Sequence, residues 1–325
     1  MKKGAVLVTA IAGDIGYSTV RSLMGTDYRL FGCDVRPHSP VSDAVDKAYL
    51  VSPASNKRQY LDEIKSIIAD HDISVFIPIS EPEIWVVNEN RQEFSSMGVK
   101  LLLNDVRILE RFLDKYTTSQ YLDSIGISVP KTVLLDDYHG GWDYPLIVKN
   151  RSGWGSRTIW KIGNEQDLNY VRTKCDSSFI VQQHVGDASE EYTTGVFSNG
   201  RKVSSISFRR RLGADGTTVE AVLSNESSLV VMAERIATAV NLVGYINIQS
   251  RRVHNAFLPF EINPRISGTV LFRKKFGFDE VIWWIDTLFG KEYSYTPLYK
   301  SGKAIRYYAE CYFDMESNLL KLHVD

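Results

Sequence analysis

The chain has little cysteine, almost no net charge and no long apolar run, and each absence excludes a class of protein. The three cysteines, Cys33, Cys175 and Cys311, are too few and too scattered for a disulfide framework or a zinc ribbon. Lys and Arg number 38 against 39 Asp and Glu, so the basic surplus typical of nucleic-acid-binding proteins is missing. A membrane span needs about 18 uninterrupted apolar residues, and the sequence contains no such run. We therefore expect a cytoplasmic protein that binds neither nucleic acid nor membrane.

What is present indicates a folded α/β protein. A hydrophobic fraction of 44% and a charged fraction of 24% are ordinary globular values, and 325 residues suffice for about two domains. Short apolar strands expected at 5–9, 28–34, 74–79 and 100–103 alternate with amphipathic helices at 60–70 and 85–94. This alternation predicts a parallel sheet with Rossmann-like winding. From residue 107 the pattern changes to one helix over 108–126 and then to α+β segments rich in strands.

A glycine turn near the amino terminus allows a first functional hypothesis. Gly13 and Gly16 lie between a strand and a helix, and Asp34 ends the next strand, as a ribose-binding acid would in a nicotinamide-dependent oxidoreductase. The dinucleotide fingerprint needs a further glycine where this chain has Ile11. A structural βα turn is the simpler interpretation.

The strongest chemical pattern is the run GYINIQSRR–VHNA–FLPFEINPRISGT, from residue 244 to residue 269. Alternation places Glu261 and Asn263 on one face of a strand. If the hairpin loop centres on Asn255, Gln249 lies opposite Glu261, and Asn247 lies opposite Asn263, on that same face. Their oxygens suit magnesium, and the Arg265 that follows suits a phosphate. The alternative is an ordinary polar face of an antiparallel hairpin.

This run resembles the metal-binding strands of the ATP-grasp superfamily, with most likeness to the large subunit of carbamoyl phosphate synthetase and related carboxylate–amine ligases. The resemblance implies that Gln249, Glu261 and Asn263 hold two Mg²⁺ ions, with Mn²⁺ as an alternative, and that Arg265 contacts phosphate and an acyl-phosphate intermediate. It also implies a Rossmann-like pre-ATP-grasp domain at 1–108, followed by a two-part α+β ATP-grasp domain. The two parts are a lid at 109–185 and a catalytic, metal-binding part at 186–325.

The resemblance extends to LDKYTTSQYLDSIGISVPKT, YPLIVKNRSGWGSR, FIVQQHVG and EEYTTG. It implies that Lys115 and Lys149 contact the nucleotide phosphates of ATP, that residues 183–185 bind the adenine edge, and that Glu191 holds the ribose hydroxyls. It further implies a mobile glycine-rich loop at 152–156, and we expect this loop to lie within a mobile lid at about 130–180. Gln183 and Gln249 depart from the acids more common at those positions. The implied nucleotide-binding residues in the loop and hinge are Ser152, Gly153, Gly155, Ser156, Gln183, His184 and Val185.

Two further positions are candidates for contact with substrate. Strand alternation sends Arg210 to one face and its neighbours Arg209 and Arg211 to the other, and Arg210 resembles family positions that meet phosphate or an acidic substrate. Glu81 follows a parallel strand at its carboxyl end, where open α/β sheets bind ligands, and it is a candidate to receive the nucleophile.

Three functions remain open at this point. The first is a ligase that activates a small carboxylate as an acyl phosphate and joins it to an amine, with Arg265, Lys149 and Arg210 as catalytic residues. The second is a small-molecule kinase that stops at phosphoryl transfer. The third is a nicotinamide-dependent oxidoreductase or a nucleotide sensor. Small-molecule substrates are expected in each case, and a homodimer is compatible with all of them.

Overall fold

The computed structural model describes residues 4–153, 159–307 and 311–314. The chain packs into two compact units. One contains the described residues of 1–103, 265–298 and 306–325, and the other contains 104–264 and 299–305. Each of the three predicted domains contains one sheet of the structure, and the boundaries between them stay a prediction. In the described part of the chain, no helix is long and apolar enough to cross a lipid bilayer.

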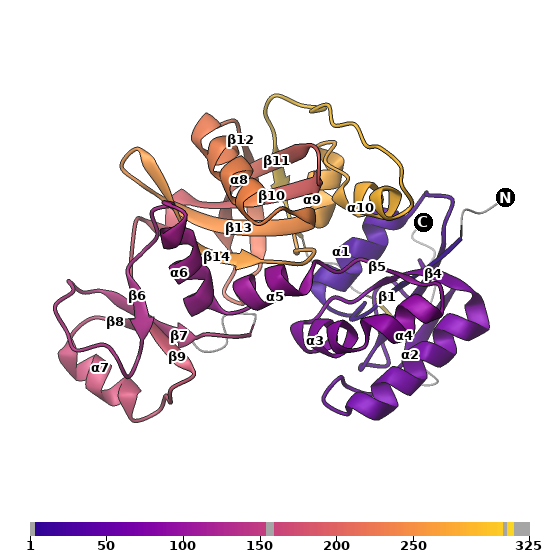
Figure 1. Ribbon diagram of the computed structural model, residues 1–325, viewed down its shortest axis with the longest axis horizontal. Helices are drawn as coiled ribbons and strands as arrows, with labels where there is room; N and C mark the ends of the chain where they lie inside the picture. The colour runs from indigo at the N-terminus through magenta and orange to yellow at the C-terminus, as the bar shows by residue number, and fades with distance from the viewer. Residues whose placement is uncertain (1–3, 154–158, 308–310, 315–325) are drawn as a thin grey trace. The chain divides into compact units, whose positions relative to one another are not determined.

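The first unit is built on a five-stranded parallel sheet in the order β3-β2-β1-β4-β5, of which Figure 1 labels β1, β4 and β5. All four residues of the central strand β1 are buried, as is usual where both faces of a parallel sheet are covered. The Rossmann-like prediction is confirmed, but it missed β3, because the residues of this edge strand are largely exposed and carry no apolar alternation. The strands are β1 (Ala5–Val8), β2 (Arg29–Asp34), β3 (Lys47–Leu50), β4 (Ile73–Ile77) and β5 (Lys100–Leu101).

The described residues of this unit form six helices. Helix α1 packs against α9 and α10, which brings residues 265–298 into the unit that contains the amino-terminal sheet. The single helix predicted over 85–94 is wrong. Asn90 separates α3 from α4, and its side chain donates to the Val86 carbonyl at 2.7 Å. The helices are α1 (Asp14–Leu23), α2 (Lys57–His71), α3 (Glu81–Glu89), α4 (Arg91–Ser96), α9 (Val270–Lys275) and α10 (Glu280–Leu288).

The strand order creates a topological switch point between β1 and β4, where the chain changes the direction in which it adds strands. Thr9, directly after β1, fixes the geometry there. Its hydroxyl donates to Glu83 at 2.9 Å and accepts from the Ile79 backbone N–H at 2.9 Å. Ser80 caps α3 and forms a capping box with Glu83. These bonds fix Glu81, the first residue of α3, at the carboxyl edge of the sheet.

The larger sheet of the second unit is antiparallel, in the order β14-β13-β10-β11-β12-β15. Helix α8 (Ser227–Ala239) packs on one face of it, in a core that includes Ile246, Ile248 and Ile262. The residues that alternate with these three point to the opposite face. The strands are β10 (Glu191–Asn199), β11 (Val203–Leu212), β12 (Thr218–Ser224), β13 (Val243–Val253), β14 (Ala256–Asn263) and β15 (Lys303–Ile305).

The smaller sheet of the second unit has four antiparallel strands in the order β6-β9-β7-β8 (Figure 1). Helix α7 (Glu165–Arg172) covers it, with Leu168 and Val171 in a core of their own with Leu146, Val148 and Val181. The strands are β6 (Thr132–Leu134), β7 (Leu146–Asn150), β8 (Ile159–Ile162) and β9 (Phe179–Gln183).

The predicted helix over 108–126 is two helices, α5 (Val106–Phe112) and α6 (Lys115–Ser124). The physical reason for the break is Asp114, whose carboxylate accepts from the backbone N–H groups of Tyr116 at 2.8 Å and Thr117 at 3.3 Å. An aspartate in this role ends one helix and begins the next. Lys115 is therefore the first residue of α6.

Candidate functional site

The predicted pairing of the polar residues on β13 and β14 is confirmed. Asn247 pairs with Asn263, and Gln249 pairs with Glu261. The predicted loop centre at Asn255 is wrong, because Val253 pairs with Ala256 and the turn consists of His254 and Asn255. A β-bulge on β14 accommodates Phe260. It lies between the pairs Gln249–Glu261 and Ser250–Pro259, and it restores the predicted pairing of Gln249 with Glu261.

The three candidate metal ligands gather around one carboxylate oxygen. Oε1 of Glu261 accepts from the side-chain amides of Asn263 at 3.0 Å and Gln249 at 3.3 Å. Desolvation raises the pKa of Glu261, but Lys115 and Lys149, together with the Asn263 hydrogen bond and Arg210, outweigh this effect and hold that pKa below its usual value. Both amides would have to turn their oxygens toward a cation in order to bind it. One carboxylate and two amides suit Mg²⁺ that is shared with phosphate oxygens.

This donor set differs from a metal site made by protein alone. Among the described residues, three or more His, Cys, Asp or Glu side chains nowhere gather into a metal-binding group. A cation at Glu261 would therefore depend on the oxygens of a bound nucleotide for much of its coordination. The residues present fit such a shared cation.

Lys149 lies on β7, and its ammonium Nζ is 3.5 Å from the backbone carbonyl oxygen of Phe260. The side chain is only 5% exposed. Burial lowers the pKa of Lys149 to about 8, with Glu261 opposing this shift and Lys115 adding to it. A buried cation beside a carboxylate that can bind a metal is suited to hold phosphate.

Lys115 is directed toward the glycine-rich loop. Its Nζ donates to the Gly153 carbonyl at 3.0 Å, and its backbone N–H donates to the Arg151 carbonyl at 2.9 Å. Arg151 in turn pairs with Asp114 at 2.5 Å. Gly153 has a φ of +103°, a conformation that favours glycine, and Ser152 beside it is exposed. Gly155 and Ser156 lie outside the described residues.

The predicted adenine-binding residues follow β9. Gln183 ends that strand, and its backbone N–H donates to the Lys131 carbonyl at 2.9 Å. His184 and Val185 come next, and both contact the guanidinium of Arg251, at 3.2 and 3.3 Å. Burial, aided by Arg251, lowers the pKa of His184. Arg251 was not among the predicted residues, although the alternation through Asn247 and Gln249 reaches it.

Glu191 lies between two arginines. Arg210 donates to its Oε1 from Nη2 at 2.7 Å and from Nε at 3.1 Å, and Arg251 donates to its Oε2 at 2.9 and 3.1 Å. Nη2 of Arg210 also donates to Oε1 of Gln249 at 2.7 Å. Arg210 thus lies on the face of the candidate ligands, as alternation predicts, while Arg209 pairs with Glu190.

Arg265 belongs to the first unit, together with Glu81. Their charged groups are 3.8 Å apart, and each side chain is 10% exposed. The Arg265 guanidinium also donates to the Ile266 carbonyl at 3.2 Å. An acid and a base therefore face each other at the carboxyl edge of the parallel sheet, although they are far apart in sequence.

Asp34, the acid on which the dinucleotide hypothesis depends, is hydrogen-bonded to protein groups. Both oxygens of Asp34 accept hydrogen bonds from the protein, at 2.8 Å from the backbone of Ala12 and at 2.8 Å from that of Arg36. Asp34 is 5% exposed, and Ile11, where the fingerprint needs glycine, is packed against Gly32 in the core. These contacts support the interpretation of the glycine turn as a structural element.

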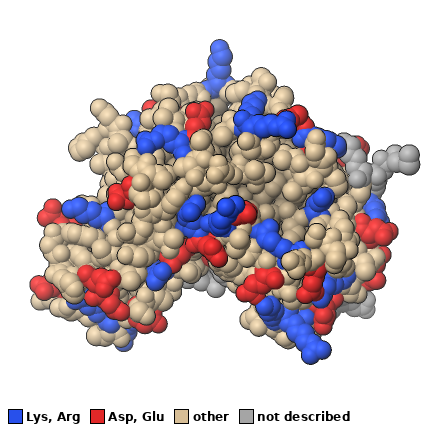
Figure 2. Space-filling model, in the orientation of Figure 1, with Lys and Arg blue, Asp and Glu red and all other residues tan. Residues whose placement is uncertain are grey.

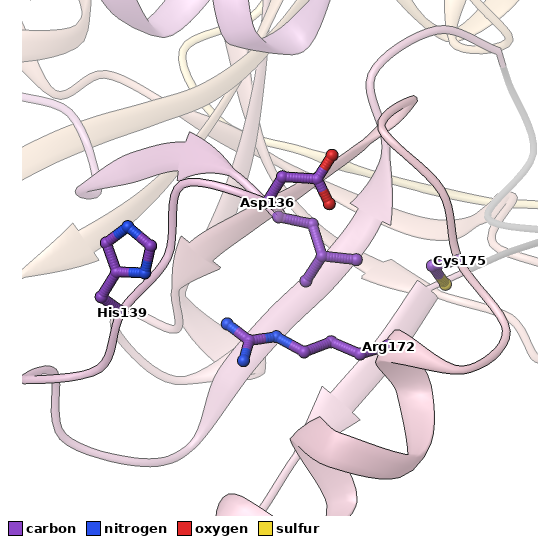
Figure 3. A pocket seen from close by; sticks show the side chains of 5 residues that line it. Asp136, His139, Arg172 and Cys175 are labelled. Atoms are coloured by element: carbon purple, nitrogen blue, oxygen red, sulfur yellow. The ribbon is translucent and has the colours of Figure 1, made fainter.

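A separate pocket of about 280 Å³ lies beside the smaller sheet of the second unit and contains none of the predicted site residues. Figure 3 shows the Arg172 side chain extending across it toward His139. Its lining residues are Leu135, Asp136, His139, Arg172 and Cys175.

On the face that Figure 2 shows, basic and acidic side chains are interspersed, in keeping with the near-zero net charge.

Comparison with known proteins defines the class to which this arrangement belongs. Residues 177–311 match the family model described as ATP-grasp in the biosynthetic pathway with Ter operon, and residues 14–102 match the PylC-like N-terminal domain. The resemblance to the ATP-grasp superfamily that was inferred from the sequence is confirmed, and residues 14–102 are similar to the PylC-like amino-terminal domain.

A curated relative is similar to part of this chain, and two solved structures share its fold. The carbamoyl phosphate synthase large chain of Campylobacter jejuni is 21% identical over 205 residues, which are 57% of this chain and 19% of that protein, so the match spans about a fifth of the relative's length. The biotin carboxylase domain dimer of Hydrogenobacter thermophilus 2-oxoglutarate carboxylase, solved with MgADP, ADP and bicarbonate, has a TM-score of 0.70 at 16% identity and covers 90% and 71% of the two chains. An N5-carboxyaminoimidazole ribonucleotide synthetase solved with ADP has a TM-score of 0.75 at 13% identity, covering 94% and 82%.

Proposed function

We propose that the protein is an ATP-dependent ligase that activates a small carboxylate as an acyl phosphate and joins it to an amine. The observation that carries this proposal is the register of β13 and β14, which brings Gln249, Glu261 and Asn263 together next to the buried Lys149. The ADP and MgADP bound to the two similar structures support the choice of nucleotide.

The residues of the second unit would bind the nucleotide. Lys149 and Lys115 supply positive charge for the phosphates, and Gln249, Glu261 and Asn263 would hold two Mg²⁺ ions. Bound Mg²⁺ supplies neutralisation of the phosphate charge. The chain itself then has to position the carboxylate and shield the reacting groups from water, which is where most of the rate enhancement of such transfers arises.

The proposed reaction has two steps whose atoms balance. A carboxylate oxygen attacks the γ-phosphorus of ATP, the bond from that phosphorus to the bridging oxygen breaks, and ADP leaves. The amine nitrogen then attacks the acyl carbon, the bond from that carbon to the phosphorylated oxygen breaks, and inorganic phosphate leaves. Arg265 would stabilise the charge on the transferred group, and Glu81, which faces it, would accept the proton that the amine loses.

Labelled oxygen distinguishes this ligase from a kinase. The purified protein is first screened for ADP release with pools of small carboxylates, each with and without amines. An active carboxylate is then labelled with ¹⁸O in its carboxyl group. A ligase transfers one label to the inorganic phosphate, because the phosphorylated oxygen leaves with it. A phosphorylated product that is stable and keeps all of its label would instead establish the kinase.

A homodimer is also part of the proposal, and it receives support only from the dimer described for the biotin carboxylase domain. Sedimentation velocity at several protein concentrations tests it directly. A single species of 36.8 kDa at all concentrations would exclude it.

A further inference from the structure

The carboxylate of Glu191 is fully occupied by protein groups. It is 4% exposed, and its two oxygens accept four N–H bonds, two from Arg210 and two from Arg251, at 2.7 to 3.1 Å. A carboxylate has about four lone-pair positions that can accept such bonds. In this arrangement Glu191 has no acceptor position left for the ribose hydroxyls that its family resemblance assigns to it.

The two arginines lead away from Glu191 in different directions. Arg210 is 9% exposed and reaches Gln249 among the candidate metal ligands. Arg251 is 20% exposed and reaches His184 and Val185 in the predicted adenine hinge. The Cζ atom of Arg251 also lies 5.8 Å from the ring centroid of Phe260. Arg251 therefore connects the buried carboxylate to the segment where the nucleoside is expected.

A count of donors shows what Arg251 can still bind. A guanidinium has five N–H groups. Nε and one N–H of Nη2 are directed to Glu191, and Nη1 serves Val185 and His184. The second N–H of Nη2 has no acceptor among the residues that the structure describes. A ribose hydroxyl is such an acceptor, and the fixed fork of an arginine held by a carboxylate is well suited to meet it.

We propose that Arg251 is a specificity-determining residue that donates a hydrogen bond to a ribose hydroxyl of the bound nucleotide, while Glu191 is a positioning residue that holds Arg251 in place. This inference rests on the proposed function, because it requires a nucleotide at the hinge. It assigns the recognition of ribose to Arg251 instead of Glu191.

The test compares the affinities for MgADP, Mg-2′-deoxy-ADP and Mg-3′-deoxy-ADP, measured by calorimetry on the full chain. The variants are Arg251→Gln, Glu191→Gln and, as the matched control, Arg252→Gln. Arg252 is the next residue on β13 and pairs with Glu226 and Glu190 instead. Circular dichroism and melting temperature show whether each variant is folded.

We expect the wild type to bind MgADP about tenfold more tightly than at least one deoxy nucleotide, as the loss of one charged hydrogen bond predicts. Arg251→Gln should reduce that ratio to about one, Glu191→Gln should reduce it as well, and Arg252→Gln should leave it unchanged. An Arg251→Gln protein with the wild-type ratio, or with tighter MgADP binding and an increased ratio, would overturn the inference and return the ribose to Glu191. A wild type that binds no MgADP would instead refute the proposed function.

Discussion

The ammonium of Lys149 lies 3.5 Å from the backbone carbonyl oxygen of Phe260, the residue that the β-bulge adds to β14. The same Nζ is 5.4 Å from the Phe260 ring centroid. The bulge thus shapes the surroundings of the lysine as well as the register of the candidate metal ligands. Because Lys149 is buried there and its pKa is about 8, its charge depends on pH in an accessible range.

Nucleotide affinity should therefore fall at alkaline pH. Only the protonated Lys149 attracts phosphate, and the bound phosphates should raise its pKa, so binding takes up a proton above about pH 8. By linkage the association constant for MgADP should decrease above pH 8, approaching tenfold per pH unit. Calorimetry between pH 7 and pH 9.5 measures this slope, and buffers of different ionisation enthalpy measure the proton uptake.

Lys149→Arg provides the control for that measurement. Arginine keeps its charge throughout this range, so the slope should disappear even if the overall affinity is lower. If the MgADP affinity of Lys149→Arg still fell with rising pH, a group other than Lys149 would be responsible for the pH dependence.

Replacement of Glu261 by glutamine should abolish turnover without unfolding the protein. The change removes the one carboxylate among the three candidate ligands but keeps an oxygen that can accept from Asn263 and Gln249. Steady-state ADP release, measured as Mg²⁺ is varied, is the readout. Glu220→Gln is the control, since Glu220 pairs with Lys303 and Arg211 near the far edge of the same sheet. Normal turnover of Glu261→Gln at limiting Mg²⁺ would remove the metal assignment.

Replacement of Arg265 by lysine should lower kcat more than it lowers nucleotide affinity. Lysine keeps a positive charge but lacks the bidentate fork of arginine. The substitution should therefore weaken the stabilisation of the transition state more than the binding of the nucleotide. We expect kcat to fall by ~10²–10³, the usual effect of removing one preorganised donor. The KM for ATP should change little. An unchanged kcat would take Arg265 out of the chemistry and leave the fold assignment intact.

The buried pair of Arg273 and Glu280 should dominate the stability of the segment after Arg265. Arg273 donates to Glu280 at 2.5 and 2.7 Å and to Ser267 at 3.0 Å, and both partners of the ion pair are fully buried. Arg273→Met leaves the Glu280 carboxylate buried without its partner, which costs about 3–5 kcal/mol of unfolding free energy. Urea denaturation measures this loss.

A neighbouring pair provides the comparison. Lys274 pairs with Asp279 at 2.9 Å, with both side chains about a quarter exposed. Because such pairs contribute at most about 1 kcal/mol, Lys274→Met should have a small effect. Equal losses of unfolding free energy in Arg273→Met and Lys274→Met would contradict a larger contribution of the buried pair.

Local patterns were sufficient to predict much of the fold and of the metal face. The period of two along β14 places Glu261 and Asn263 on one face, and the register of β13, which the β-bulge restores, adds Gln249 to that face. The alternation of strands and helices likewise predicted the parallel sheet. Where a predicted helix was wrong, a single polar side chain competed with the helical backbone, as Asp114 and Asn90 do at the two breaks.

Only the tertiary structure decided what the site residues can do. The sequence contains Glu191, Arg210 and Arg251 on three strands, but it does not reveal that both arginines meet on one buried carboxylate. Nor does it reveal that Lys149 is buried enough to titrate near pH 8, or that Glu81 faces Arg265. Side-chain alternation is a property of neighbouring residues along the chain, and the sequence therefore determines it. Burial and ion pairing depend on which distant strands become neighbours, and only the folded chain fixes that.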